Sequence, residues 1–241
     1  PWRLSLLFLV SGYASRALFV RHTGPWPFMR NRTARLLIPL VFGMAVIVPP
    51  QAWVELVTQH GYARGFLPFW TSDYFAVARV DGIVLPTWNH LWFVAYLWVY
   101  TLLLTAMLTI TPRGVKAAAQ RLFDRLFGGV GALILPMAWL MLVSGVLFPG
   151  ARETHEMLGD WVAHASYFPM VVLGYAMAGS ERMIATFARL WKVTALFALL
   201  AFLTVATIQI VFAGYRVTPR PFGTIFSLAR GVQGWMTIAA L

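Results

Sequence analysis

The chain contains no cysteine, and few of its residues carry charge. Its 241 residues include only 8 Asp and Glu, and charged residues make up 11% of the total. The missing thiol excludes a disulfide, a thiolate metal site and an acyl-cysteine intermediate. The low charge content argues against a soluble globular domain, in which about 25% of residues are charged.

Long apolar segments occupy most of the chain instead. Hydrophobic residues make up 60% of it, and the mean hydropathy is +0.72. About 20 apolar residues form a helix long enough to cross a bilayer, whereas a membrane barrel would show short alternating strands. We therefore expect an all-α polytopic transmembrane bundle, forming one membrane domain over residues 1–241. Seven spans are expected at Leu4–Val20, Leu36–Leu56, His90–Ile110, Val130–Phe148, Trp161–Ala178, Val193–Ala213 and Phe222–Leu241.

The positive charge is unevenly distributed among the loops. The net charge is +11, and eleven of the nineteen Lys and Arg residues follow the first, third and fifth expected spans. On a soluble protein such a charge would suggest nucleic acid, but basic residues in cytoplasmic loops also fix membrane topology. We therefore assign these loops to the cytoplasm and expect membrane lipid, not nucleic acid, as a partner.

Two loops are longer than simple hairpins. Residues Gly114–Phe127 alternate basic and apolar positions at helical spacing, which predicts an amphipathic helix lying on the inner membrane surface. The loop from Thr58 to Asn89 is rich in aromatic residues, Gly and Pro and lies on the outer side. Long ordered loops often carry function.

Three arginines directly precede the second expected span. Residues three apart share a helix face, so Arg32 and Arg35, with Arg30 beside them, are placed to present two guanidiniums to one phosphate or pyrophosphate. The alternative is that these arginines anchor to lipid headgroups and set the topology. The residues alone leave both interpretations open.

The third span opens with the sequence Trp88-Asn89-His90-Leu91-Trp92-Phe93. A histidine at the outer end of a span is a candidate general base toward a hydroxyl, because its pKa lies near working pH. The alternative is an interfacial histidine that caps a helix, flanked by tryptophans of the aromatic belt. His90 is the candidate catalytic residue of this chain.

A candidate polar pair, Asp160 and His164, lies one turn apart in the fifth span. Titratable residues within a membrane segment are functional candidates, although a polar helix–helix contact is the simpler interpretation. No His, Asp and Glu set has the spacing of a metal site, so we expect no metal. No phosphate-binding glycine loop and no nucleophile elbow is present either.

Three motifs in order carry a resemblance to a known family. They are Phe8-Leu9-Val10-Ser11-Gly12-Tyr13, then Arg32-x-x-Arg35-Leu36-Leu37-Ile38-Pro39, then His90-Leu91-Trp92-Phe93. Their order and spacing resemble the acyltransferase-3 family of multi-pass membrane acyltransferases, from its second helix onward. Within that family they resemble the glucan biosynthesis protein C branch, whose members are glucan succinyltransferases.

The resemblance implies a bundle of about ten helices and transfer of an acyl group, acetyl or succinyl, from cytoplasmic acyl-CoA to a glycan hydroxyl outside. Acyl-CoA is then a donor substrate, and no permanently bound cofactor is implied. Arg30, Arg32 and Arg35 take the donor-binding role, and Asn89 and Trp92 shape the acceptor side. A bacterial inner membrane location follows from the same resemblance.

The family's proposed catalytic histidine lies on its first helix, which would precede Pro1 here. We therefore expect the chain to be a fragment that lacks the first and last helices of the family. The alternative function is a multi-span transporter or flippase for an anionic lipid-linked sugar or metabolite, for which paired repeats would be typical. A non-catalytic membrane scaffold is a third. The acyl group, the acceptor and the oligomeric state are not fixed by the sequence.

Overall fold

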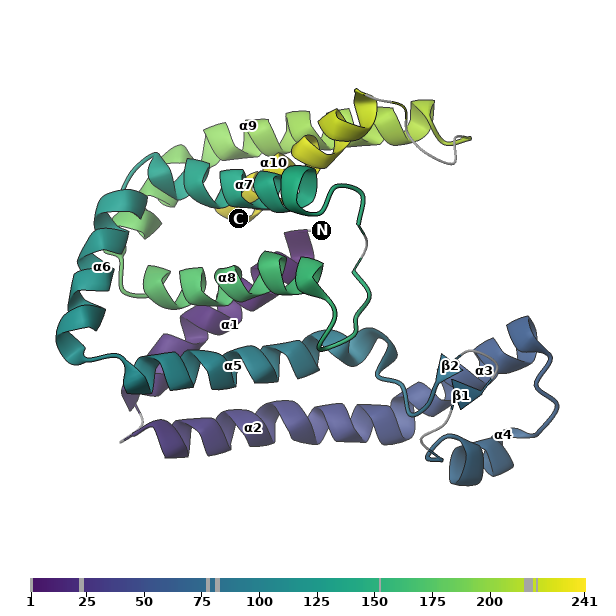
Figure 1. Cartoon of the computed structure of the whole chain (residues 1–241). Coiled ribbons are helices and arrows are strands. Elements are labelled where there is room, and N and C mark those ends of the chain that lie inside the picture. Colours follow the sequence, from purple (N-terminus) through teal and green to yellow (C-terminus); the bar gives the residue numbers. More distant parts are fainter. Residues whose placement is uncertain are drawn as a thin grey trace. The chain divides into compact units, whose positions relative to one another are not determined.

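The computed structural model describes residues 2–21, 24–76, 79–80, 83–151, 153–214, 219 and 221–241. These residues are mostly helical, with one short antiparallel pair of strands, which confirms the all-α class (Figure 1). Each of the seven expected apolar segments lies within a helical segment except for a few residues at its ends. Among the described residues, four helical segments are long and apolar enough to cross a membrane, or five if one bent pair is a single span. The protein is a multi-pass membrane protein.

The chain divides into two compact units. The first comprises residues 1–23 and 104–241, and the second comprises residues 24–103. Each unit is described by itself below. The expectation of one membrane domain over residues 1–241 stays a prediction.

In the first unit, helix α1 (Trp2–Arg21) packs against α8 (Trp161–Met177) at very short range. A Cβ atom on Gly12 would stand 2.0 Å from the carbonyl oxygen of Val171, and one on Gly174 would stand 1.9 Å from that of Leu9. Small residues let membrane helices approach in this way, since association there depends on close van der Waals packing. The rings of Phe8 and Tyr167 stack in the same contact, with centroids 4.8 Å apart.

Three further helices pack together in the same unit. The indole of Trp235 is fully buried and donates from Nε1 to the carbonyl oxygen of Ala132 at 3.0 Å. Leu133, Met236 and Ala239 form an apolar core in the same unit. The elements are α7 (Gly131–Leu142) with its π-helical end η4 (Val143–Leu147), α9 (Glu181–Val211) and α10 (Phe222–Ala240).

Helix α6 (Arg113–Phe127) confirms the amphipathic helix that the sequence predicts. Its direction differs from that of the neighbouring apolar helices, because the chain bends by 93° between α6 and the segment Gly131–Leu147 (Figure 1). If Gly131–Leu147 crosses a bilayer, a helix at 93° to it lies along the membrane surface. The bend therefore agrees with the predicted surface position.

The second unit is built on a long helix and the loop that covers its end. Helix α2 (Pro25–Phe42) continues through the π-helical turn η1 (Gly43–Ile47) into α3 (Val48–His60). The loop then forms α4 (Phe66–Pro68), η2 (Phe69–Asp73), the strands β1 (Arg79–Val80) and β2 (Ile83–Val84), and the 3₁₀ turn η3 (Asn89–Leu91) before α5 (Trp92–Ile110). The strands pair Arg79 with Val84 and Val80 with Ile83. Residues 77–78 and 81–82 of the expected outer loop lie outside the described residues.

The start of α2 corrects one expectation. The sequence places Arg30, Arg32 and Arg35 in a loop before a span beginning at Leu36, but the helix begins at Pro25. Proline suits the first helical turn, because its fixed φ matches the helix and its missing N–H has no partner there. The three arginines therefore lie on a rigid helix, with a fixed angular relation to one another.

Candidate functional site

The arginines occupy the second and third turns of α2 in the second unit. Arg30 and Arg35 are exposed, and Arg32 is half-buried. Thr33, between them, accepts a hydrogen bond of 3.1 Å from Nε1 of Trp98 on α5. That bond fastens this part of α2 to α5, which lies alongside it (Figure 1). The guanidiniums are thus displayed from an anchored helix.

The two exposed arginines of this cluster, Arg30 and Arg35, form no ion pair within the described residues. Arg32 and Arg35 lie close enough for their charges to repel each other. Like charges one turn apart destabilise a helix by a few tenths of a kcal/mol, so an anion that bridges them would relieve this cost. The cluster is therefore suited to a phosphate or pyrophosphate group.

The π-helical turn that follows α2 brings the Asn89–His90 segment to this helix. A Cβ atom on Gly43 would stand 2.4 Å from Cδ1 of Leu91, so the two segments touch where glycine leaves room. The buried hydroxyl of Tyr74 lies 2.8 Å from the carbonyl oxygen of Met44 and 3.0 Å from that of Thr87. Burial raises the pKa of Tyr74 to about 12, so the hydroxyl keeps its proton at working pH.

These contacts set the spacing between the two sequence motifs. Leu91 packs at the level of Gly43, which follows Arg35 by eight residues. At 1.5 Å per residue, eight residues of helix correspond to about 12 Å along the axis. This is less than half of a hydrocarbon core of about 30 Å. An extended substrate arm can therefore reach from Arg35 to the level of Leu91 along one helix.

A depression lies beside Asn89. Its volume is about 520 Å³, and Nδ2 of Asn89 donates to Oε1 of Gln51 across it at 3.4 Å. Asn89 has a φ of 42°, a left-handed conformation that asparagine adopts more readily than most residues. The lining consists of Pro50, Gln51, Val54, Glu55, Thr58, Gln59 and Asn89. Amide, hydroxyl and carboxylate groups of this kind hydrogen-bond sugar hydroxyls.

Sequence reasoning found Asn89 but missed the residues of α3 that face it. A signal was present, because Gln51, Glu55, Thr58 and Gln59 recur at helical spacing, four, three and one residues apart. Such spacing places polar groups on one side of a helix. The sequence alone divides these residues between the expected span, which ends at Leu56, and the outer loop, which begins at Thr58, so it does not group them.

The other two residues of the predicted acceptor side have different surroundings. His90 is exposed in the 3₁₀ turn that precedes α5. Trp92 is buried and packs edge-on against Tyr96, with ring centroids 5.1 Å apart. The described lining of the depression includes neither of them. Asn89 is the predicted residue that the structure brings into the depression.

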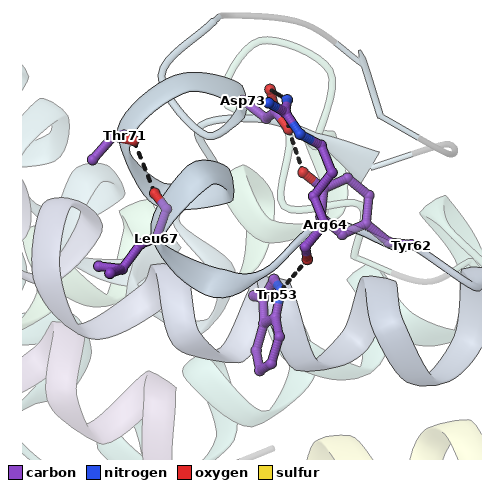
Figure 2. A network of polar contacts seen from close by, with 6 residues as sticks. All are labelled: Trp53, Tyr62, Arg64, Leu67, Thr71 and Asp73. Carbon is purple, nitrogen blue, oxygen red and sulfur yellow. Dashed lines mark hydrogen bonds and ion pairs between the residues drawn. The ribbon is translucent and has the colours of Figure 1, made fainter.

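The loop above this site is held by a small polar network (Figure 2). The carboxylate of Asp73 accepts hydrogen bonds from the hydroxyl of Tyr62 and from Nη1 of Arg64, the latter at 2.8 Å to Oδ1. Nε1 of Trp53 on α3 donates to the carbonyl oxygen of Arg64 at 3.1 Å. Nε1 of Trp70 donates to the carbonyl oxygen of Ala45 at 2.8 Å. The loop is therefore fastened to both η1 and α3.

This network predicts a dependence of loop order on pH. The hydrogen bond from Tyr62 and the charge of Arg64 hold the pKa of Asp73 below its ordinary value of 3.8. A carboxyl group whose pKa is lower in the folded protein than in the unfolded chain stabilises the fold at pH values above its unfolded pKa. This stabilisation is lost as the pH falls through the folded pKa. Burial and Asp73 raise the pKa of Tyr62 above 10.0, so the hydroxyl keeps donating at neutral pH.

We expect Asp73→Asn to loosen residues 61–74 at pH 7 and the native loop to loosen below pH 3.8. Hydrogen exchange, corrected for intrinsic rates, measures both effects. Thr71→Ala is the control, because the Thr71 hydroxyl bonds only within its own turn, to the carbonyl oxygen of Leu67 at 2.8 Å (Figure 2). Equal protection in Asp73→Asn and the native protein at pH 7 would contradict the role given to the network.

The predicted pair Asp160 and His164 lies in the first unit. Asp160 is buried and caps α8, accepting from the backbone N–H of Ala163 at 3.0 Å and that of His155 at 2.7 Å. A ring nitrogen of His164 lies 2.8 Å from the carbonyl oxygen of Met157. These contacts give both side chains a part in holding the start of α8. Interaction between the two side chains stays a prediction.

Comparison with known proteins gives a family match over nearly the whole chain. A family model described as an acyltransferase domain matches residues 1–238. No curated protein and no solved structure matches. In the part of the chain that the structure describes, no group of His, Cys, Asp and Glu has the arrangement of a metal site.

Proposed function

Because the chain belongs to the acyltransferase-3 family, we propose that it transfers an acyl group, acetyl or succinyl, from cytoplasmic acyl-CoA to a glycan hydroxyl outside the membrane. The family itself establishes a membrane acyltransferase. The donor, the acceptor and a bacterial inner membrane location are the proposed part. One observation carries the proposal: an arginine cluster and a depression lined in part by amide and hydroxyl groups lie along one continuous helical segment, α2 with η1 and α3.

The arginines supply the donor end. Coenzyme A carries several phosphates on a long narrow arm, and guanidinium groups bind phosphate through paired hydrogen bonds. Arg30, Arg32 and Arg35 would hold the phosphates at the cytoplasmic end of α2. The arm would then extend along α2 toward Gly43, over the distance of about 12 Å along the axis that separates Arg35 from the level of Leu91.

The depression supplies the acceptor end. Its amide and hydroxyl groups, on Gln51, Thr58, Gln59 and Asn89, are neutral hydrogen-bonding partners for a sugar. Glu55 adds one carboxylate, which accepts bonds from sugar hydroxyls but repels an anionic acceptor. A neutral or hydroxyl-rich glycan therefore fits this surface better than a phosphorylated one.

The transfer step needs a base on the acceptor side. The oxygen of the acceptor hydroxyl bonds to the thioester carbonyl carbon, the carbon–sulfur bond breaks, and the hydroxyl proton passes to the base. The thiolate of coenzyme A then takes up a proton and leaves as the thiol. His90 follows Asn89 directly and is exposed, so it is the candidate base in this chain.

The direct test is transfer itself. Protein reconstituted in nanodiscs is incubated with radiolabelled acetyl-CoA or succinyl-CoA and a neutral oligoglucan, and label in the glucan is counted. Label in the glucan that depends on protein and donor supports the proposal. Binding or movement of an anionic sugar lipid without acyl transfer would favour the transporter alternative.

Changes in the depression should affect the acceptor and spare the donor. We expect Gln51→Ala with Asn89→Ala to raise KM for the glucan about 30-fold, because each of the two lost neutral hydrogen bonds weakens binding by about 1 kcal/mol. The KM for acyl-CoA should stay unchanged. Thr71→Ala, on the loop outside the depression, is the matched control. A changed donor KM with an unchanged acceptor KM would contradict the assignment of the depression.

A further inference from the structure

A charged pocket lies in the first unit. The functional site described above belongs to the second unit. Its volume is about 570 Å³, and its lining comes from the end of α6, the corner after it and the first turn of α9. The lining consists of Arg121, Asp124, Arg125, Gly128, Gly129 and Arg182. Three guanidiniums therefore surround one space, with a single carboxylate among them.

The carboxylate does not neutralise these arginines. Oδ1 of Asp124 accepts from Nε2 of Gln120 at 3.2 Å, and Oε1 of Gln120 accepts from Nη1 of Arg16 at 2.7 Å. Asp124 is thus engaged toward α1. Within the described ranges, no ion pair involves Arg121, Arg125 or Arg182. The pocket keeps a surplus of positive charge.

The corner of the chain shapes this pocket. A Cβ atom on Gly128 would stand 2.2 Å from the carbonyl oxygen of Asp124 and 3.3 Å from Cδ of Arg182. The absence of a side chain at Gly128 therefore lets the stem of Arg182 approach the end of α6. This close approach brings a guanidinium from α9 to the two on α6.

The position of α6 points to the kind of anion. It makes an angle of 93° with the apolar segment Gly131–Leu147, so it lies along the bilayer surface when that segment crosses the bilayer. Leu122 and Leu126 on α6 are 56% and 47% exposed. The same helix thus offers arginines to a polar group and exposed leucines to an apolar one, at the depth where headgroups meet acyl chains.

We propose that this pocket binds the phosphate of an anionic phospholipid in the leaflet that faces α6. The lipid phosphate would lie among Arg121, Arg125 and Arg182, and its acyl chains would run past Leu122 and Leu126. A soluble phosphate would use the arginines alone and leave the leucines uncovered. The charge distribution assigns this surface to the cytoplasmic leaflet, where anionic lipids attract basic residues.

The test compares two double variants that remove the same charge from the same two helices. Arg125→Gln with Arg182→Gln changes the pocket, and Arg113→Gln with Arg189→Gln changes exposed positions of α6 and α9 outside it. Delipidated protein in detergent is titrated with phosphatidylglycerol or phosphatidylcholine, and bound lipid is counted by native mass spectrometry. Arg182→Lys, which keeps the charge, is a third variant with less risk to folding.

We expect one saturable phosphatidylglycerol site, weakened about tenfold or more in the pocket variant and less than twofold in the control pair. Arg182→Lys should lie between them, because lysine keeps the charge but loses the paired hydrogen bonds. Equal loss in both double variants would reduce the effect to general surface charge and overturn the proposal. Equal binding of phosphatidylcholine, or displacement of phosphatidylglycerol by inorganic pyrophosphate, would overturn it too.

Discussion

Replacing Arg32 and Arg35 together with glutamine should lower acyl-CoA-dependent transfer by at least about 100-fold. A charged hydrogen bond to a phosphate contributes about 1.5–3 kcal/mol, and two such partners are removed at once. Each 1.4 kcal/mol corresponds to about a factor of ten. The loss should appear mainly as a higher KM for the donor, because the arginines bind a part of the substrate that does not react. Steady-state kinetics in nanodiscs separates KM from kcat.

Two further variants define what this result means. Arg32→Lys with Arg35→Lys keeps both charges but loses the planar fork, so activity should recover only in part. Arg113→Gln with Arg189→Gln removes two exposed arginines elsewhere and should leave donor KM unchanged. If the glutamine pair on α2 is well folded and retains the native donor KM, the arginines serve membrane anchoring and the donor role is wrong.

The class of fold could be predicted because apolar length and the need to satisfy the backbone leave few choices in lipid. The boundaries of the helices could not be predicted in the same way. The expected span beginning at Leu36 starts at Pro25, since a polar helix surface near an interface has no hydropathy signal. The π-helical turn Gly43–Ile47 also could not be predicted, and its Gly43 contacts Leu91, a residue distant in the sequence.

The candidate site was predicted in its charged part and not in its polar part. Arg32 and Arg35 stand out because a charge beside an apolar segment is costly and therefore needs a reason. Gln51, Glu55 and Gln59 give no such signal in the sequence, since polar residues near the end of a span are common. They become a candidate site only when η3 brings Asn89 to α3, which requires the whole folded loop.

Gly174→Ala should be among the most destabilising single methyl additions in the described part of the chain. The new Cβ would stand 1.9 Å from the carbonyl oxygen of Leu9, 2.8 Å from its carbonyl carbon and 3.0 Å from the backbone nitrogen of Tyr13. Rotation of a side chain cannot relieve a clash with backbone, so α1 and α8 must separate. Overpacking costs about 1–3 kcal/mol even where side chains can move, and a rigid contact lies at or above the upper end.

Separation of α1 from α8 would also disturb the stacked rings of Phe8 and Tyr167 and weaken packing along the whole pair. A cost of about 3 kcal/mol lowers Tm by roughly 6–12 °C for a chain of this size. The measurement is thermal unfolding in detergent at one fixed scan rate.

Gly114→Ala is the matched control and should change Tm in the opposite direction, because nothing lies within 4 Å of its added methyl group on α6. Alanine stabilises an exposed helix over glycine by about 0.5–1 kcal/mol, so its Tm should rise slightly. Equal Tm values for the two variants would mean that α1 and α8 do not pack at this distance.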